Sequence, residues 1–421
     1  MKVLWFTNTP ANAVEYLMDG PVGGGWLKAL DKSLQKRIEL HVAFYYPKTN
    51  VPFKYLESKY YPIKPGNWII RVLKGILFPF VIDRQDIQHY LKIIDLVKPD
   101  IVHIHGTENP FGCIIPFIDQ PVVVSIQGCM TVYHHKFLDG FTKHELRIWS
   151  FKHFKSIRDI VRYKSFIRTF QEFRKMKKRE RKTLGYTKYI IGRTDWDKRI
   201  TSVLAPERIY FHGDEMLRET FYNLVWKVQK RKKLLVHTTN ANNAHKGFET
   251  LCEALYELNS MSDLNIEWQV AGINVDDDIV KAARKKLKHR FPENGITYLG
   301  SINEDKLADM LCNADMYVSP SHIENSPNSL CEAMLIGIPC IATFAGGTSS
   351  LLTDKVDGIL IQDGDPWSLA GAILELYRNP ELAVNYGLKA RNRALKRHDP
   401  ERIVAELLNS YQHIIDDYKH I

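Results

Sequence analysis

The feature that most constrains the fold is a regular alternation of short apolar runs with longer helical patterns along nearly the whole chain. The first six runs are KVLWFTN, ELHVAFYY, DIVHIHG, VVVSIQG, KYIIGRT and RIYFHG, and the second six are KLLVHTTN, IEWQVAG, ITYLG, MYVSPS, CIATFAG and GILIQ. Near-continuous apolar strands separated by helices are typical of parallel sheets that are covered on both faces. Twelve strands in two sets therefore predict an α/β protein with two doubly wound domains. A (β/α)8 barrel would need only about eight strands.

The same rhythm suggests the domain boundaries. A chain of 421 residues is expected to form two or three domains, at about 100–200 residues per domain. The first set of strands predicts an N-terminal domain over 1–210, and the second set predicts a C-terminal domain over 211–399. After Asp399-Pro400, apolar residues recur on one helical face, so we predict a final helix over 400–421.

The composition excludes several classes of protein. Values of 45% apolar and 25% charged residues are ordinary for a globular protein and exclude fibrous, low-complexity and largely disordered chains. Six cysteines without a C-x-x-C pair are too sparse for a secreted disulfide framework. The N-terminus, MKVLWFTNTP, lacks the apolar region of a signal peptide, so we expect a cytoplasmic protein.

The charge is concentrated in one segment. The chain carries 58 basic and 48 acidic residues, a net charge of +10, and residues 143–188 alone carry a net +12. Apolar residues recur in that segment at three- and four-residue steps, which predicts an amphipathic helix with a basic face. That face is either solvated, or it lies against anionic lipid headgroups and makes the protein peripheral on the inner face of the cell membrane.

A second segment is strongly apolar. NWIIRVLKGILFPFVI, at 67–82, is shorter than the roughly 20 residues that span a bilayer. It is interpreted either as a buried core helix or as a segment of a peripheral enzyme that dips into a membrane.

Parallel-sheet domains bind ligands at the carboxyl ends of their strands, so the residues that follow each strand are candidates. Gly23, Gly24 and Gly25 follow the first strand and precede a helical pattern, where backbone amides can approach an anion closely. Lys246-Gly247 stands at the start of a helix in the second half and suits a phosphate group. The glycines are equally compatible with a simple turn, and Lys246 taken singly is better explained as a solvated lysine at a turn.

The most informative stretch is YVSPSHIENSPNSLCEAMLIGIPCIATFAGG. Ser326 is predicted to cap a helix that begins at Pro327. The amides of the first turn are then available to an anion such as a pyrophosphate, and they belong to Asn328, Ser329 and Leu330. Glu324 lies before this helix and Glu332 lies within it, so the two carboxylates are predicted to accept hydrogen bonds from hydroxyl groups at opposite ends of one ligand.

This stretch resembles the donor-binding signature of glycosyltransferase family 4. The shared pattern is S-P-S-x-x-E-N-S-P-N-S-L-x-E-A-M-x-x-G-x-P followed by A-x-x-x-G-G, and it is specific from about Tyr317 to Gly358. A looser match covers nearly the whole chain and includes the glycine loop, the H-x-H strand and the K-G pair. The resemblance implies the GT-B fold, in which two Rossmann-like domains face each other across a cleft and a C-terminal helix crosses back to the first domain.

The resemblance also implies roles for individual residues. Glu332 corresponds to the acid that binds the nucleotide ribose, Glu324 to the acid at the hydroxyls of the donor sugar, and Lys246 to the lysine that neutralises the donor diphosphate. Gly23 and Gly24 correspond to the first-domain loop near the diphosphate, and we count Gly24 and Gly25 among the donor-binding residues.

Two positions depart from the family pattern. The arginine that usually precedes the lysine is missing from HTTNANNAHKG, where Thr238 or Asn240 can offer hydrogen bonds instead. Arg193 is a candidate replacement for that arginine, or else it forms a structural salt bridge. Where the family often has a sugar-facing histidine, this chain has Gln127, whose amide can still bind a sugar and which we count as catalytic. If a histidine is required, the candidates nearby in sequence are His103, His105, His134 and His135.

Together these features predict a retaining glycosyltransferase that moves a sugar from a nucleoside-diphosphate sugar to a glycan or lipid-linked acceptor, in surface polysaccharide or lipopolysaccharide biosynthesis. Glu324, Gln127 and Lys246 are the predicted catalytic residues, with Lys246 stabilising charge on the leaving phosphate. We see no D-x-D motif in a suitable loop and expect neither a catalytic metal nor a cofactor.

Two other functions are considered. The same scaffold serves other activities, such as that of a sugar-phosphate synthase or an epimerase. The basic segment alone would also suit a nucleic-acid-binding protein, but the sequence has no zinc-ligand spacing or RNA-recognition motif, so we expect no nucleic-acid partner.

Overall fold

The protein is described from a computed structural model that places residues 1–17, 25–65, 84–142, 144–145, 166–229, 232–261 and 264–420. The apolar segment at 67–82 and residues 146–165 of the basic segment lie outside the described residues. The chain forms two compact units, each described here by itself. The first contains Met1–Thr131, Phe173–Arg218 and His398–Ile421, and the second contains Val132–Glu172 and Glu219–Arg397. The predicted boundaries at 210 and 399 stay predictions, and residues 132–172 group with the second unit.

The first unit is built on a sheet with the strand order β3-β4-β2-β1-β5-β6-β7-β8. Its strands are β1 (Lys2–Thr7), β2 (Glu39–Tyr45), β3 (Phe53–Tyr55), β4 (Ser58–Ile63), β5 (Ile101–His105), β6 (Val122–Ser125), β7 (Tyr189–Gly192) and β8 (Ile209–His212). All neighbours pair in parallel except β3 and β4. This antiparallel pair was not predicted, because β3 has only three residues at the sheet edge and β4 contains Pro62.

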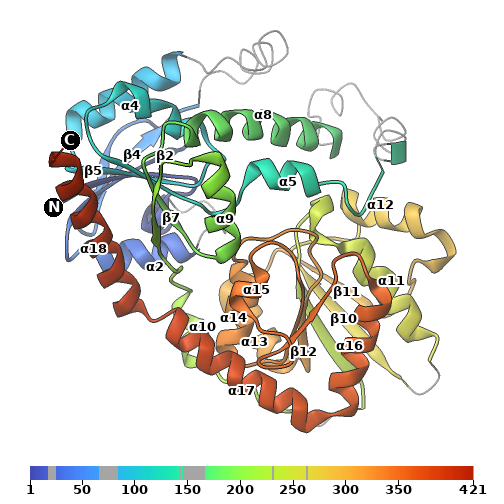
Figure 1. Ribbon diagram of the computed structural model, residues 1–421. Coiled ribbons are helices and arrows are strands. Elements are labelled where there is room, and N and C mark those ends of the chain that lie inside the picture. The colour runs from blue at the N-terminus through green and yellow to red at the C-terminus, as the bar shows by residue number, and fades with distance from the viewer. Residues whose placement is uncertain are drawn as a thin grey trace. The chain divides into compact units, whose positions relative to one another are not determined.

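Helices cover both faces of this sheet (Figure 1). They are α1 (Val14–Leu17), α2 (Gly25–Leu34), α4 (Arg84–Val97), α5 (Met130–Lys136), α8 (Phe166–Leu184), α9 (Asp195–Leu204) and α18 (Pro400–Lys419), of which α5 and α8 cross the boundary between the units. In β1, Val3 and Trp5 join the hydrophobic core on one face, whereas Leu4 and Phe6 join the core on the other. Burial on both faces explains why the strand is continuously apolar rather than alternating.

The predicted final helix is present as α18, and it packs on the first unit (Figure 1). Asp399 caps it by accepting a hydrogen bond from the Arg402 amide at 2.7 Å. Its apolar face enters the core through Ile403, Val404, Tyr411, Ile414 and Ile415. The buried Tyr411 hydroxyl lies 3.0 Å from Trp5 Nε1, which donates to it, and 2.5 Å from Nδ1 of His103. The helix is thus tied to both β1 and β5.

The second unit has the strand order β11-β10-β9-β12-β13-β14, and all of its paired neighbours are parallel. The strands are β9 (Leu234–Thr239), β10 (Ile266–Ala271), β11 (Ile296–Gly300), β12 (Met316–Ser319), β13 (Cys340–Thr343) and β14 (Ile359–Ile361). The order reverses between β9 and β12, and in doubly wound sheets the ligand site lies at this reversal, beyond the carboxyl ends of the strands. The predicted fold class, with two doubly wound parallel sheets, is confirmed.

The second unit also has helices around its sheet (Figure 1). They are α10 (Glu219–Asn223), α11 (Phe248–Asn259), α12 (Asp278–Leu287), α13 (Glu304–Asn313), α14 (Asn328–Ile336), α15 (Thr348–Leu351), α16 (Pro366–Arg378) and α17 (Pro380–Arg397). Within the described residues of both units, every helix falls short of the combined length and apolar character that a bilayer-crossing helix requires.

Candidate functional site

The site lies where the strand order of the second sheet reverses. Strand β9 is followed by a loop and a short 3-10 helix, Ala244–Lys246, and β12 is followed by the loop 320–327 that leads into α14. Because β9 and β12 are neighbours in the sheet, both connections leave the same edge side by side. The topology therefore brings together Lys246 and Glu324, although 78 residues separate them in sequence.

Lys246 and Glu324 form an ion pair between Nζ and Oε1. The side chain of Glu324 is 9% exposed and that of Lys246 is 25% exposed, so the carboxylate is nearly desolvated while the ammonium group still reaches solvent. The Ser321 hydroxyl donates a second hydrogen bond to the same Glu324 oxygen at 3.0 Å. The arrangement places a fixed cation and a hydrogen-bonding carboxylate next to each other, which suits a ligand that carries both phosphate and hydroxyl groups.

Two glycines allow the loop 320–327 to approach its neighbours. Gly247 has φ +66°, and a Cβ there would clash with the carbonyl oxygen of Pro320. Gly346 has φ +59°, and a Cβ there would clash with the carbonyl oxygen of Glu324, which accepts a hydrogen bond from the Gly347 amide at 2.9 Å. The K-G pair therefore packs against the start of the loop at Pro320, and the G-G pair packs against the backbone of Glu324.

A buried charge cluster lies beneath the loop, and the sequence analysis did not identify it. His322 Nε2 is 2.5 Å from Oε1 of Glu249, and His322 Nδ1 is 3.7 Å from Oδ2 of Asp363. The side chains of His322 and Glu249 are both 2% exposed. Burial alone would lower the pKa of His322, but the two carboxylates outweigh it and raise that pKa to about 9.

The cluster also shifts the pKa of both acids. Burial would raise the pKa of Glu249, but the positive charge and hydrogen bond of His322 prevail and lower it. The proximity of His322 is also the largest cause that lowers the pKa of Asp363. His322 is therefore an imidazolium at neutral pH, held by two carboxylates. In the sequence this cluster is indicated only by a histidine within S-H-I-E and an acid after K-G-F, and neither pattern is specific.

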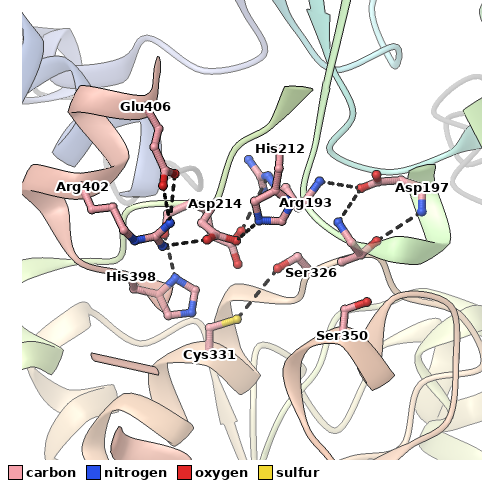
Figure 2. A network of polar contacts seen from close by, with 12 residues as sticks. Arg193, Asp197, His212, Asp214, Ser326, Cys331, Ser350, His398, Arg402 and Glu406 are labelled. Atoms are coloured by element: carbon pink, nitrogen blue, oxygen red, sulfur yellow. Dashed lines mark hydrogen bonds and ion pairs between the residues drawn. The ribbon is translucent and has the colours of Figure 1, made fainter. Parts of the chain in front are cut away.

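The predicted cap of α14 is wrong in detail. The N-cap residue is Pro327 and the helix begins at Asn328, because Pro327 has an extended ψ of 115°. The Ser326 hydroxyl instead lies 3.9 Å from Cys331 Sγ, as Figure 2 shows. The Leu330 amide donates to the Pro327 carbonyl at 3.0 Å, so it is already bonded within the first turn. Asn328 and Ser329 lie half-buried in that turn, and their role toward an anion stays a prediction.

Glu332 lies one helical turn beyond Asn328 on α14 and is 3% exposed. Residues four apart share a face of a helix, so the Glu332 side chain is directed to the same side as that of Asn328. A carboxylate is rarely buried to this extent without polar partners. Its predicted role at a ribose remains to be tested.

The two polar residues proposed to replace the missing arginine serve the local structure. The Thr238 hydroxyl is fully buried, donates to the Val318 carbonyl at 2.8 Å and accepts from Trp268 Nε1 at 2.9 Å. Both of its hydrogen bonds thus stay within the unit, which contradicts a role in ligand binding. Asn240 donates from Nδ2 to the Lys246 carbonyl at 3.3 Å, so it shapes the turn that carries the lysine.

Three other predicted residues belong to the first unit. Gln127 follows β6 and is half-buried, and Gly25 is the first residue of α2, whereas Gly23 and Gly24 lie outside the described residues. The Arg193 guanidinium stacks 4.3 Å from the ring of Trp26, and its Nε is 3.7 Å from Oε2 of the buried Glu215. This geometry favours the structural salt bridge over the replacement of a phosphate-binding arginine.

Of the four alternative histidines, two belong to the core of the first unit. His103 also contacts the Ser125 hydroxyl through Nε2 at 2.5 Å, and burial lowers its pKa to about 3. His105 stacks on His103 with ring centroids 3.8 Å apart, and burial lowers its pKa as well. His134 stacks on Phe170, and His135 is exposed. Both core histidines are therefore neutral at physiological pH.

Sequence comparisons connect this chain with known proteins. Residues 223–393 match the family Glycosyl transferases group 1. A curated relative, the N-acetyl-alpha-D-glucosaminyl L-malate synthase of Bacillus anthracis, is 25% identical over 214 residues, which are 51% of this chain and 53% of that protein. The chain spans about half the length of the curated relatives it matches, with 53%, 43% and 42% covered in three of them.

Two solved structures are similar over nearly the whole chain. Sucrose-phosphate synthase from Thermosynechococcus elongatus has a TM-score of 0.73 at 14% identity, with 99% of each chain covered. The HepE protein of Anabaena, in complex with UDP and glucose, has a TM-score of 0.64 at 15% identity, with 98% of this chain and 99% of that chain covered. At these identities the likeness shows a shared fold.

Proposed function

We propose that this protein is a glycosyltransferase that uses a nucleoside-diphosphate sugar as donor, because residues 223–393 match the glycosyl transferases group 1 family and the full-length likeness is to proteins of the GT-B fold. The observation that carries the proposal is the Lys246–Glu324 ion pair at the strand reversal of the second sheet. The proposal extends to transfer with retention of anomeric configuration, to a glycan or lipid-linked acceptor in surface polysaccharide or lipopolysaccharide biosynthesis.

The geometry suits departure of a nucleoside diphosphate from a sugar. Negative charge develops on the leaving phosphate, and Lys246 is a fixed cation that stabilises this charge without reorganisation. Glu324, desolvated and hydrogen-bonded by Ser321, is positioned to accept hydrogen bonds from the hydroxyls of the sugar. When a phosphate binds Lys246, the carboxylate exchanges part of its ion pair for these hydroxyls. No carboxylate nucleophile is needed if the leaving phosphate assists deprotonation of the acceptor on the same face of the sugar.

The donor is tested with a panel of sugar nucleotides that differ in base and sugar, with nucleoside monophosphates and free sugars as ligand controls. A donor at 100 times its dissociation constant should stabilise the fold by about 2.7 kcal/mol, which a thermal-shift assay detects. Active donors are then incubated with acceptors, and the anomeric configuration of the product is read by NMR. A panel in which no sugar nucleotide raises the melting temperature would contradict the proposal.

We also propose that the exposed face of α8 contacts an anionic membrane. The exposed residues on α8 include Arg174, Lys178, Arg181 and Lys182, at steps that follow one side of a helix. The two acids of α8 do not neutralise these cations. Glu180 is fully buried and accepts hydrogen bonds from Thr107 and Thr131, and Glu172 pairs with Arg168. Each cation at an anionic surface contributes about 1 kcal/mol, so four of them support reversible binding.

Reversal of these four charges should abolish flotation of the protein with vesicles that contain anionic phosphatidylglycerol. The matched control reverses four exposed lysines of the second unit, and these are Lys281, Lys285, Lys389 and Lys396. Both variants change the net charge equally, so a difference in flotation between them depends on where the charges lie and not on the total charge. If the α8 variant floats as well as the wild-type protein, the membrane contact is wrong. Residues Lys152 to Arg162 of the same basic segment lie outside the described residues.

A further inference from the structure

We propose that His322 is a positioning residue of the donor site, which holds the loop of Glu324 and the turn of Lys246 at a fixed separation through its ion pair with Glu249. This inference rests on the proposed function of the Lys246–Glu324 pair. His322 itself is buried and does not reach a ligand, so it acts through the residues beside it.

The two loops are joined by two ion pairs of opposite polarity. The turn after β9 contributes the cation Lys246 and, three residues later, the anion Glu249. The loop after β12 contributes the cation His322 and, two residues later, the anion Glu324. Lys246 pairs with Glu324, and Glu249 pairs with His322, so each loop gives one charge of each sign to the other. A backbone hydrogen bond from the His322 amide to the His245 carbonyl, at 2.8 Å, also joins the two loops.

The two ion pairs differ in their access to solvent. Lys246 is 25% exposed, whereas both members of the His322–Glu249 pair are 2% exposed. A donor phosphate that attracts Lys246 weakens the outer pair and leaves the inner pair intact. The inner pair therefore keeps Glu324 in place at the moment when Glu324 loses part of its own cation. A single ion pair between the loops could not both release Lys246 to the donor phosphate and keep Glu324 in place.

The inner pair is closed off by the segment that follows α5. A Cβ on Gly140 would clash with Oε1 of Glu249 and lie 2.8 Å from Nε2 of His322, so only glycine fits there. The Gly140 carbonyl is held by Lys286 Nζ at 2.6 Å. On its other side, His322 faces Asp363, and Lys136 lies 3.9 Å from that carboxylate. On the Gly140 side the pair is thus covered by backbone and not by a flexible side chain.

The charged and titratable groups around His322 come from several elements. Glu249 is on α11 and Asp363 follows β14, and they are the anions that favour the imidazolium. Lys286 on α12 lowers the pKa of Glu249, and Lys136 on α5 lowers that of Asp363, so both acids stay ionised. The neighbouring His245 stays neutral, because burial and the charges of Lys246 and His322 lower its pKa well below the ordinary value.

The inner pair has a defined dependence on pH. The pKa of His322 is about 9 in the folded protein and its ordinary value is 6.5, so folding raises it. The stability from this group is fully present below pH 6.5 and is lost as the pH rises through about 9. Since Glu249 and Asp363 remain ionised in this range, deprotonation of His322 alone removes the inner ion pair between the two loops.

The test compares the pH dependence of kcat/KM for the donor, from pH 7 to 10, in the wild-type protein and three variants. The wild type should lose at least tenfold in kcat/KM as the pH rises through about 9. D363N removes one anion next to His322 and should move this loss to lower pH. H322Q should have a low kcat at all pH values and no loss near pH 9. The control D365N removes a charge two residues away, where asparagine caps α16 equally well, and should keep the wild-type profile.

Thermal unfolding across the same pH range separates the outcomes. If the melting temperature falls near pH 9 and shifts in D363N while kcat/KM does neither, His322 is structural and the inference is overturned. An unshifted kcat/KM profile in D363N overturns it as well, even if H322Q does not fold. If no sugar nucleotide is turned over at any pH, the proposed function itself fails, and the inference fails with it. A decrease in kcat/KM that occurs near pH 9 in the wild type and at lower pH in D363N supports the inference.

Discussion

Replacing Lys246 by methionine should reduce glycosyl transfer by roughly 10²- to 10³-fold, the usual effect of removing one preorganised group that stabilises developing charge. The same substitution leaves Glu324 as an unpaired carboxylate whose side chain is only 9% exposed. Breaking a buried ion pair by removing one partner destabilises a protein by several kcal/mol, and because Lys246 still reaches solvent we expect about 2–4 kcal/mol here. Loss of activity and loss of stability are thus expected together.

The double variant K246M/E324Q separates the two effects. Neutralising the carboxylate removes the unpaired charge, so most of the stability measured by chemical denaturation should return. Turnover of the donor should not return, because the cation at the phosphate is still missing. If the double variant recovers transfer as well as stability, Lys246 is only a structural partner of Glu324. Lys233→Met is a suitable control, since it breaks a more exposed ion pair, with Glu267, in the same unit.

Replacing Glu332 by glutamine should weaken the binding of the nucleoside diphosphate by roughly 10- to 100-fold. The carboxylate is predicted to accept hydrogen bonds from two ribose hydroxyls, and hydrogen bonds to a charged group contribute about 1.5–3 kcal/mol. Glutamine has nearly the same volume, so α14 should keep its packing. Isothermal titration calorimetry measures the change directly, without dependence on an acceptor.

The control for Glu332 is Glu267→Gln. Glu267 is an ionised acid of the same unit on β10, paired with Lys233 and with the hydroxyl of Thr297. Its replacement changes the net charge by the same amount at a distance in sequence from α14, and nucleotide affinity should be unchanged. An affinity of E332Q that equals the wild type would remove Glu332 from the site, and equal losses in both variants would indicate a general charge effect.

The sequence predicted the strands well because most of them are buried along their whole length or nearly so. All twelve predicted runs form strands, and in β1 the side chains from Val3 to Thr7 are buried, so a continuous apolar run is the direct signature of a covered parallel sheet. The two strands that were missed, β3 and β4, form the antiparallel edge pair. A three-residue edge strand has no such signature, because only its neighbour on one side is in the sheet.

The candidate site was predictable where it follows from topology. Lys246 and Glu324 were identified because each lies in the connection between a strand and the next helix, and strand ends converge in a doubly wound sheet. Thr238 was misassigned because its hydroxyl is used by Val318 and Trp268 on two neighbouring strands, which no local pattern reveals. The His322–Glu249 pair was missed for a similar reason. Its members are 73 residues apart, and a lone histidine in a loop has no signal for a buried acid on a helix.

The return of the last helix to the first unit has a consequence for the order of folding. The core of the first unit includes Trp5 near the start of the chain and Tyr411 near its end, whereas the second unit is complete at Arg397. During synthesis the second unit therefore has all its residues before the first unit does. Until α18 emerges from the ribosome, Trp5 and His103 lack the hydroxyl that bonds them, and the core on that face of the first sheet lacks the apolar residues of α18. The first unit begins to be synthesised before the second unit, but it is the last to receive all of its residues.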